Sequence, residues 1–163
     1  NGADKALGHG SFAALLDRFK VSRYSILCLA ETHYSTQHYL SQHNLERQCC
    51  SRRFKGWFTH NDEGRAGVAI IVRAGWLTEG GAVSVSEIEP GRCMLATINV
   101  IGGGVANVAI AYAPSCNTGG ARATFFENLA SKLPQGCLLG GDFNVVHDTE
   151  LDLIRPYSKH PYD

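Results

Sequence analysis

The sequence Gly140-Gly141-Asp142-Phe143-Asn144 brings a carboxylate and an amide together after the apolar run 137–139. Side chains two residues apart in a β-strand point the same way, so a strand here predicts that Asp142 and Asn144 share one face. The two glycines carry no side chain that would block close approach by a ligand or by backbone. This pair suits a hard metal ion and a phosphate ester. The alternative is a plain turn, because Asp and Asn are common where strands end.

A second carboxylate follows another apolar run. Glu31 comes directly after Tyr24–Ala30, and a continuous apolar run of this length predicts a strand covered on both faces. In open α/β sheets, ligands bind at the carboxyl ends of strands. We therefore expect Glu31 and Asp142 to meet in space although they are far apart in the sequence.

A tyrosine marks a third strand end. Val105–Ala111 continues into Tyr112, and Pro114 cannot extend a hydrogen-bonded ladder and biases Ala113 toward an extended conformation. The Tyr112 hydroxyl can donate a hydrogen bond to a phosphate oxygen. Taken alone, Tyr112 is also compatible with an ordinary strand aromatic.

These residues need elements that hold them in place. Strands are expected at Ser25–Ala30, Gly56–His60, Gly67–Arg73, Ala82–Ile88, Cys93–Val100, Val105–Tyr112 and Cys137–Gly141. Helices are expected from Ser11 to about Lys20 and from about Ala121 to Leu133, and Gly102–Gly104 is expected to form a hairpin loop. Many strands between two helices predict a mixed α/β fold.

Composition narrows the class of protein. The 163 residues are 44% hydrophobic and 18% charged with a formal net charge of zero, which predicts one globular domain without a large basic surface. No apolar run approaches the roughly 18 residues of a membrane span, and no signal peptide is visible. The six cysteines form no CxxC pair, so neither zinc nor a secreted disulfide framework is expected, and an intracellular compartment fits best.

For the other polar and aromatic features we favour a structural role over a functional one. The densest basic cluster comprises Arg47, Arg52, Arg53 and Lys55. A solvated loop is favoured over a DNA contact for this cluster. Trp57 and Trp76 are expected to pack in the core. The evenly spaced His33, His38 and His43 are expected at the surface, because helical metal pairs use spacings of three or four.

Four motifs occur in a fixed order: Glu31-Thr32-His33, Ala66-Gly67-Val68-Ala69-Ile70-Ile71-Val72, Tyr112-Ala113-Pro114 and Gly140-Gly141-Asp142-Phe143-Asn144. Together they resemble the endonuclease/exonuclease/phosphatase (DNase I-like) superfamily, and most of all the endonuclease domain of non-LTR (LINE-type) retrotransposons. The resemblance runs from about Asn1 to about Asp152. It implies a layered α/β sandwich of two mixed β-sheets flanked by helices.

The resemblance also implies a reaction and a set of functional residues. The reaction is metal-dependent phosphodiester hydrolysis, with DNA as substrate and Mg²⁺ or Mn²⁺ as cofactor. The implied metal-binding residues are Glu31, Asp142 and Asn144, and the implied catalytic residues are Tyr112, Asp142 and Asn144. Asn1 and Ser115 match substrate-binding positions. A nuclear location would follow from a retrotransposon origin, and neither a membrane nor an obligate protein partner is expected.

The sequence departs from the family pattern at both ends. We expect residues 1–163 to be a single domain that lacks the family's first strand and its closing strand with the catalytic histidine. His147 and His160 stand in the wrong context to replace that histidine, and Ser115 stands where the family usually has Asn. Impaired catalysis is therefore expected. The alternatives are a non-catalytic remnant of the fold, or another branch such as a phosphoinositide phosphatase or sphingomyelinase.

Overall fold

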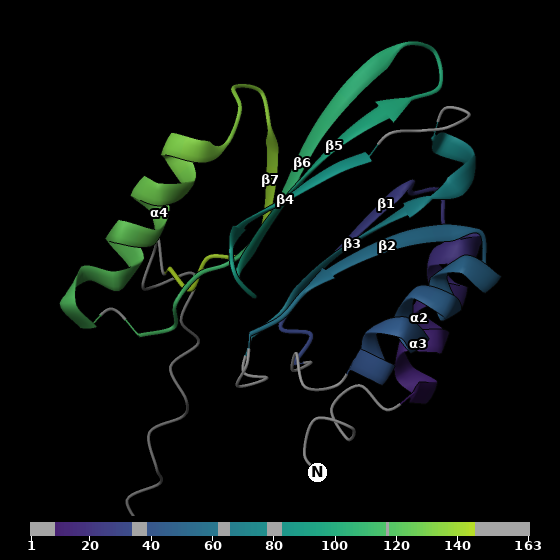
Figure 1. Cartoon of the computed structure of the whole chain (residues 1–163), viewed down its shortest axis with the longest axis horizontal. Coiled ribbons are helices and arrows are strands. Elements are labelled where there is room, and N and C mark those ends of the chain that lie inside the picture. The colour runs from purple at the N-terminus through teal and green to yellow at the C-terminus, as the bar shows by residue number, and fades with distance from the viewer. Residues whose placement is uncertain (1–8, 34–38, 62–65, 78–82, 117, 146–163) are drawn as a thin grey trace, which may run out of the picture.

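The structure is a computed structural model that describes residues 9–33, 39–61, 66–77, 83–116 and 118–145. Two β-sheets lie face to face with helices on the outside (Figure 1). In chain order the elements are α2 (His9–Val21), β1 (Ile26–Ala30), α3 (Tyr39–Ser51), β2 (Phe54–Thr59), β3 (Val68–Arg73), η1 (Ala74–Trp76), β4 (Val83–Glu89), β5 (Cys93–Val100), β6 (Gly104–Tyr112), η2 (Thr118–Gly120), α4 (Ala121–Lys132) and β7 (Leu138–Asp142).

The first sheet has the strand order β1-β3-β2 and is antiparallel throughout. Its central strand β3 is buried on both faces because its side chains alternate between two layers. Ile71 packs toward α2 and α3 with Phe12, Leu16 and Leu45, whereas Ile70 belongs to the core between the sheets. The apolar sequence of β3 is thus explained by two covered faces.

The second sheet has the strand order β4-β5-β6-β7. The first three strands are antiparallel, and β7 pairs with β6 in parallel. A parallel pair needs a crossover connection, and α4 supplies it by burying Phe125 and Leu129 against Cys93 and Ala111 on the outer face.

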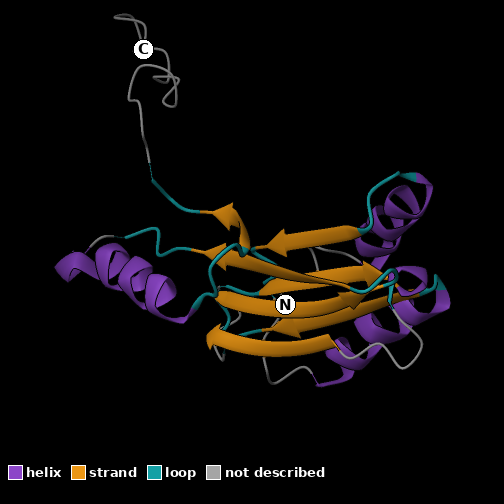
Figure 2. Cartoon of the chain, turned by 90° about the horizontal axis from the view of Figure 1, so that it is seen from above, coloured by secondary structure: helices purple, strands orange, loops and turns teal. Residues whose placement is uncertain are grey.

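The main core lies between the two sheets. It contains Ile70 of β3 together with Met94, Ile98 and Ile110 of the second sheet. Figure 2 shows the strands of both sheets running roughly alongside one another, with helices beyond them on either side. The predicted layered α/β sandwich with two sheets and flanking helices is confirmed.

Each of the seven predicted strands is present, with ends that differ by a few residues from the predicted ones. Both predicted helices are present as α2 and α4. The helix α3 was not predicted, because Leu45 and Cys49 are the only buried side chains among its described ones and give a weak apolar stripe. The hairpin between β5 and β6 is confirmed, although Gly104 belongs to β6 rather than to the loop.

β1, which was expected to be covered on both faces, is an edge strand, and so is β7. β1 lies at an edge of the first sheet with all five residues only partly buried, and β7 lies at an edge of the second sheet with all five residues exposed. An edge position leaves one side of each strand without a strand neighbour in the described part of the chain. The apolar sequence alone therefore did not show that these two strands lie at the edges of their sheets.

Three smaller expectations also need correction. Trp76 is 42% exposed and is not a core residue. The basic cluster is not a loop, because Arg47 lies in α3 and Lys55 lies in β2. Cys28, Cys93 and Cys137 lie in apolar strand-like runs, which predict that all three are buried; Cys93 is buried, but Cys28 and Cys137 are only partly buried. No helix in the described part of the chain is long and apolar enough to cross a membrane.

Candidate functional site

The three predicted strand-end residues lie at one edge of the sandwich. Tyr112 and Asp142 are the last residues of β6 and β7, and the parallel pairing makes them direct neighbours. Glu31 immediately follows the last residue of β1, in the other sheet. We call the edge that carries Glu31, Tyr112 and Asp142 the site edge.

The Tyr112 hydroxyl joins the two sheets by donating a hydrogen bond to the Glu31 carboxylate. This hydrogen bond is the largest cause of the raised pKa of Tyr112, and burial and the negative charges of Glu31 and Asp142 act in the same direction. The Arg92 guanidinium opposes them. Both carboxylates act on one phenol, so Glu31 and Asp142 lie at the same edge of the sandwich.

Asn144 is placed at the site by a turn, and not by the alternation of side chains along a strand. β7 ends at Asp142, and Asn144 adopts a left-handed backbone conformation with φ 48°. The Asn144 backbone N–H donates to Asp142 Oδ1 at 2.9 Å, and its side-chain Nδ2 donates to the Ala113 carbonyl at 2.8 Å. A turn therefore fixes Asn144 beside Asp142. The prediction that the two residues share one face of a strand was wrong, because Asn144 lies beyond the end of β7.

Gly141 lets β7 approach β6 closely. Its φ of +147° is a conformation that other residues rarely adopt, and a Cβ atom there would lie 1.8 Å from the Ala111 carbonyl oxygen. At Gly140 a Cβ would meet nothing within 4 Å. The expectation that glycine permits a close backbone approach is thus confirmed at Gly141, one residue before the carboxylate that it helps to place.

A tight turn after β1 aims Glu31. Glu31 has φ 56° and His33 has φ 55°, and both values are unusual for residues other than glycine. The turn is held by the Thr32 N–H to the Gly67 carbonyl and by the His33 N–H to the Ala66 carbonyl, each at 3.0 Å. His33 Nε2 lies 4.0 Å from the Glu31 carboxylate. Strain kept at such a position is typical of functional sites.

Arg92 also belongs to this site and was not predicted. Its guanidinium carbon lies 5.4 Å from the centre of the Tyr112 ring, and its NH1 donates to the Tyr112 carbonyl at 3.3 Å. The Tyr112 N–H donates in return to the Arg92 carbonyl at 2.7 Å. In the sequence, Arg92 is only a cation that follows a Pro-Gly turn. Its partner Tyr112 lies on a strand that is distant in the sequence, so the contact was not predicted.

A second missed arginine supports the other side of the site. Arg122, near the start of α4, donates from its NH1 to the Asn144 carbonyl. This bond ties the crossover helix to the turn that follows β7. No local pattern in the sequence distinguishes Arg122 from the other residues of this helix, so its contact with the turn was not predicted.

Two carboxylates are available to hold a divalent metal. Within the described ranges, no three side chains among His, Cys, Asp and Glu cluster in a way that could hold a metal ion. Mg²⁺ is, however, usually bound by one or two carboxylates together with waters and substrate phosphates. Glu31 and Asp142, which both act on Tyr112, fit such a site.

The remaining predicted residues contribute less to this arrangement. Ser115 is exposed just beyond Pro114, and no hydrogen bond of its side chain to Glu31, Tyr112 or Asp142 is present in the described structure. Asn1, His147 and His160 lie outside the described residues. The structure therefore brings together Glu31, Tyr112, Asp142 and Asn144 from the predicted set.

Comparison with known sequences and structures gives one family and one fold. The sequence pattern of the endonuclease/exonuclease/phosphatase family matches residues 1–151. A comparison with curated protein sequences found no match. An AP endonuclease from Archaeoglobus fulgidus is similar in structure, with TM-score 0.54 and 18% identity over 84% of this chain and 53% of that one.

Two further solved structures share the fold. Truncated Caenorhabditis elegans TDP2 has TM-score 0.51 and 17% identity over 90% of this chain and 60% of that one. ANGEL2, a 2′,3′-cyclic phosphatase in complex with adenosine-2′,3′-vanadate, has TM-score 0.52 and 15% identity over 83% of this chain and 44% of that one. The chain thus spans about half the length of these structures.

Proposed function

Because this chain belongs to the endonuclease/exonuclease/phosphatase family, we propose that its site edge serves metal-dependent hydrolysis of phosphodiesters, with DNA as the substrate. The single observation that carries the proposal is that Tyr112 and Asp142 pair at the ends of β6 and β7, next to the end of β1 that is followed by Glu31. The similar structures described as an AP endonuclease and a cyclic phosphatase support phosphoryl chemistry on this fold.

Each residue of the site has a role that its chemistry allows. Glu31 and Asp142 would hold Mg²⁺ or Mn²⁺, which prefer oxygen ligands, and the ion would stabilise negative charge on the scissile phosphate. Asp142 would orient or deprotonate the attacking water. Tyr112, whose raised pKa keeps its phenol protonated, would donate to a phosphate oxygen as charge develops. Asn144 keeps a second amide N–H for the same purpose.

Within the family, we propose the endonuclease of a non-LTR retrotransposon as the specific type. The motifs Glu31-Thr32-His33 and Ala66–Val72 support this choice over phosphatase and sphingomyelinase branches. Asn1 and Ser115 would contact substrate in a minor way. A reverse-transcriptase reading frame beside the coding sequence would support this type, and a nuclear location would follow from it.

A plasmid-nicking assay tests the proposed reaction. Supercoiled plasmid and Mg²⁺ are incubated with the 163-residue chain, with a chain extended at both ends, and with Asp142→Ala in each background. We expect the extended chain to produce open circles and the 163-residue chain to produce few, because members of a catalytic unit act together. Asp142→Ala should abolish nicking. Failure of the extended chain to nick would favour a non-catalytic remnant of the fold.

A further inference from the structure

A basic pocket lies at the edge of the sandwich opposite the site edge. β3 begins beside the end of β1, at the site edge, and ends at Arg73 on the far side. A pocket of about 480 Å³ opens there. It is lined by Lys20, Arg52, Arg53, Phe54, Arg73, Gly75 and Trp76, which we call the basic pocket. The pocket shares no residue with the proposed catalytic site.

Arg73 is one of the residues that line the basic pocket, and its side chain is fixed in place. Its guanidinium donates to the carbonyls of Lys20 at 3.2 Å, Ser22 at 2.7 Å and Tyr24 at 2.7 Å, around the end of α2. Its guanidinium carbon also lies 5.7 Å from the centre of the Phe54 ring. Carbonyl groups carry no formal charge, so Arg73 keeps its formal positive charge, although the dipole at the C-terminal end of α2 offsets part of it.

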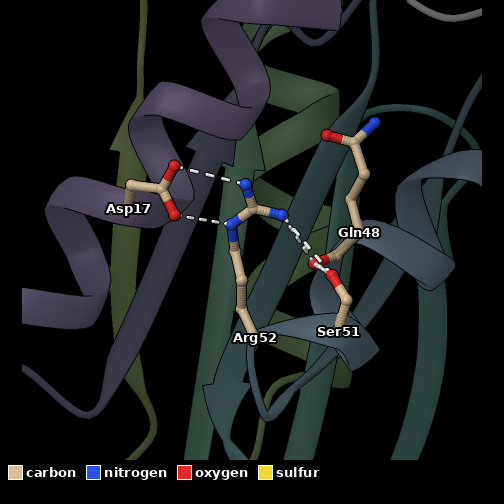
Figure 3. A network of polar contacts seen from close by, with 4 residues as sticks. All are labelled: Asp17, Gln48, Ser51 and Arg52. Atoms are coloured by element: carbon tan, nitrogen blue, oxygen red, sulfur yellow. Dashed lines mark hydrogen bonds and ion pairs between the residues drawn. The ribbon is translucent and has the colours of Figure 1, made fainter.

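Arg52 is held in a different way. Its Nε and NH2 donate to the two carboxylate oxygens of Asp17 at 2.7 and 3.2 Å, and its NH1 donates to the Gln48 carbonyl at 3.4 Å (Figure 3). The hydrogen bond from Arg52 lowers the pKa of Asp17. This pair ties α2 to the end of α3, and it removes one positive charge from the four that line the pocket.

Two cations at the rim remain available to a ligand. Lys20 and Arg53 are both exposed, and neither takes part in an ion pair within the described ranges. The backbone of Arg53 is nevertheless fixed, because its N–H donates to the Cys50 carbonyl and its own carbonyl accepts from the Ala74 N–H at 2.9 Å. Together with Arg73, the side chains of Lys20 and Arg53 give the basic pocket a net positive charge.

Trp76 supplies an aromatic wall next to this charge. It is 42% exposed, and its carbonyl accepts a hydrogen bond from the Ile101 N–H at 3.3 Å, which anchors η1 to the hairpin between β5 and β6. A second hollow of about 350 Å³ is lined by Trp76 together with Gly75, Val100 and Ile101. Trp76 therefore lines both a basic hollow and an apolar one.

We propose that the basic pocket binds single-stranded nucleic acid, with phosphates on Lys20 and Arg53 and a base stacked against Trp76. Cationic grooves lined by exposed aromatic side chains are the general means of holding single strands without sequence preference. The arginines suit phosphate, because a planar guanidinium can bond two oxygens at once. The cationic groups line a hollow rather than a protruding surface, which favours a thin strand over a flat membrane.

Binding of a labelled single-stranded oligonucleotide tests this proposal. Fluorescence anisotropy is measured in EDTA at low salt, so that neither divalent metal nor cleavage contributes and failure of the nuclease proposal would leave the result unaffected. We expect Arg53→Glu and Trp76→Ala each to weaken binding about tenfold or more. Lys132→Glu on α4 makes the same change of charge on another face and should change affinity less than about twofold. Trp76→Phe should retain most of the binding.

Intrinsic fluorescence and salt dependence provide independent readouts. In a Trp57→Phe background, Trp76 is the one remaining tryptophan, and its emission should be quenched by the oligonucleotide. The slope of log affinity against log salt should fall by about 0.7 in Arg53→Gln, because one phosphate contact is lost.

Three results would overturn the proposal. They are equal affinities of wild type and Arg53→Glu, Trp76 emission that the oligonucleotide leaves unchanged, and binding to anionic lipid vesicles without binding to the oligonucleotide. Thermal unfolding of each variant verifies that it is folded, and Arg53→Gln gives a milder substitution if Arg53→Glu does not fold.

Discussion

Tyr112 links the two halves of the candidate site. Its hydroxyl interacts with Glu31, which follows β1 of the first sheet, and its neighbour across the β6–β7 pair of the second sheet is Asp142. The interaction with the Tyr112 hydroxyl, which raises the pKa of that phenol, restrains the Glu31 carboxylate. The left-handed backbone of Glu31 restricts it further. Metal binding would therefore use carboxylates that are already close to their working positions.

Glu31→Gln should weaken binding of Mn²⁺ by about tenfold, or about 1.4 kcal/mol, because one of two carboxylate ligands is replaced by a neutral amide. Isothermal titration calorimetry measures the affinity. Glu127→Gln on the exposed surface of α4 is the matched control and should bind Mn²⁺ like the wild type. Equal affinity in Glu31→Gln would show that Glu31 is not a ligand.

His60 should make the stability of the protein depend on pH. Burial lowers the pKa of His60 below its ordinary value of 6.5, because the charged imidazolium is poorly solvated there. The unfolded chain therefore binds more protons below pH 6.5. The resulting contribution to stability is present above pH 6.5 and is lost as the pH falls through the lower pKa of the folded state.

Urea unfolding between pH 5 and 8 measures this effect. The free energy of unfolding should fall more steeply with acidification in the wild type than in His60→Asn, which does not titrate. Parallel pH profiles for the two proteins would contradict the prediction.

The residues of the site could be predicted from the sequence, but their supports could not. Glu31, Tyr112 and Asp142 each follow an apolar strand, and strand ends meet at sheet edges, so their convergence was predictable. Asn144 reaches the site through a turn whose geometry a strand pattern does not contain. Arg92 depends on the pairing of β5 with β6, which no local pattern reveals.

At the scale of elements, the parallel pair of β6 and β7 depends on one glycine. Gly141→Ala should destabilise the protein by roughly 2–4 kcal/mol, because a Cβ would collide with the Ala111 carbonyl and the positive φ would be strained. Gly140→Ala, at the preceding position with open space, is the control and should cost less than about 1 kcal/mol. Thermal and urea unfolding measure both changes, and equal costs would contradict this account of β7.

Strand positions were more predictable than strand surroundings. The seven strand-like stretches of sequence identified the seven strands, because β-branched, aromatic and apolar residues are enriched in them. The same runs could not show which strands lie at an edge, because an apolar strand has the same sequence whether its neighbours are present or absent. β4, by contrast, alternates Val and Ser as an edge strand with one exposed face does.

In the part of the chain that the structure describes, the second sheet has an open edge at β7. Leu138 is 69% exposed and Leu139 is 39% exposed, and they lie on a strand with no partner on one side in the described part of the chain. Exposed apolar edge strands are sites of association between chains. We therefore expect the 163-residue chain to self-associate through β7.

Leu138→Lys should reduce this association, because lysine at an edge opposes strand pairing. Light scattering coupled to size-exclusion chromatography should show that about tenfold more protein is needed to form dimers or larger species. Val21→Lys is the matched control, since Val21 is 86% exposed but lies at the end of α2 and not in the second sheet. A monomeric wild type, or an equal effect of both variants, would contradict the prediction.

Each sheet is built from one uninterrupted stretch of chain, because the strands of the first lie within residues 26–73 and those of the second within residues 83–142. During synthesis, the ribosome therefore releases every strand of the first sheet, with Glu31, before any strand of the second. Asp142 ends the last of the described strands to emerge. A nascent chain therefore cannot bring Glu31 and Asp142 together until its second sheet has closed on the first.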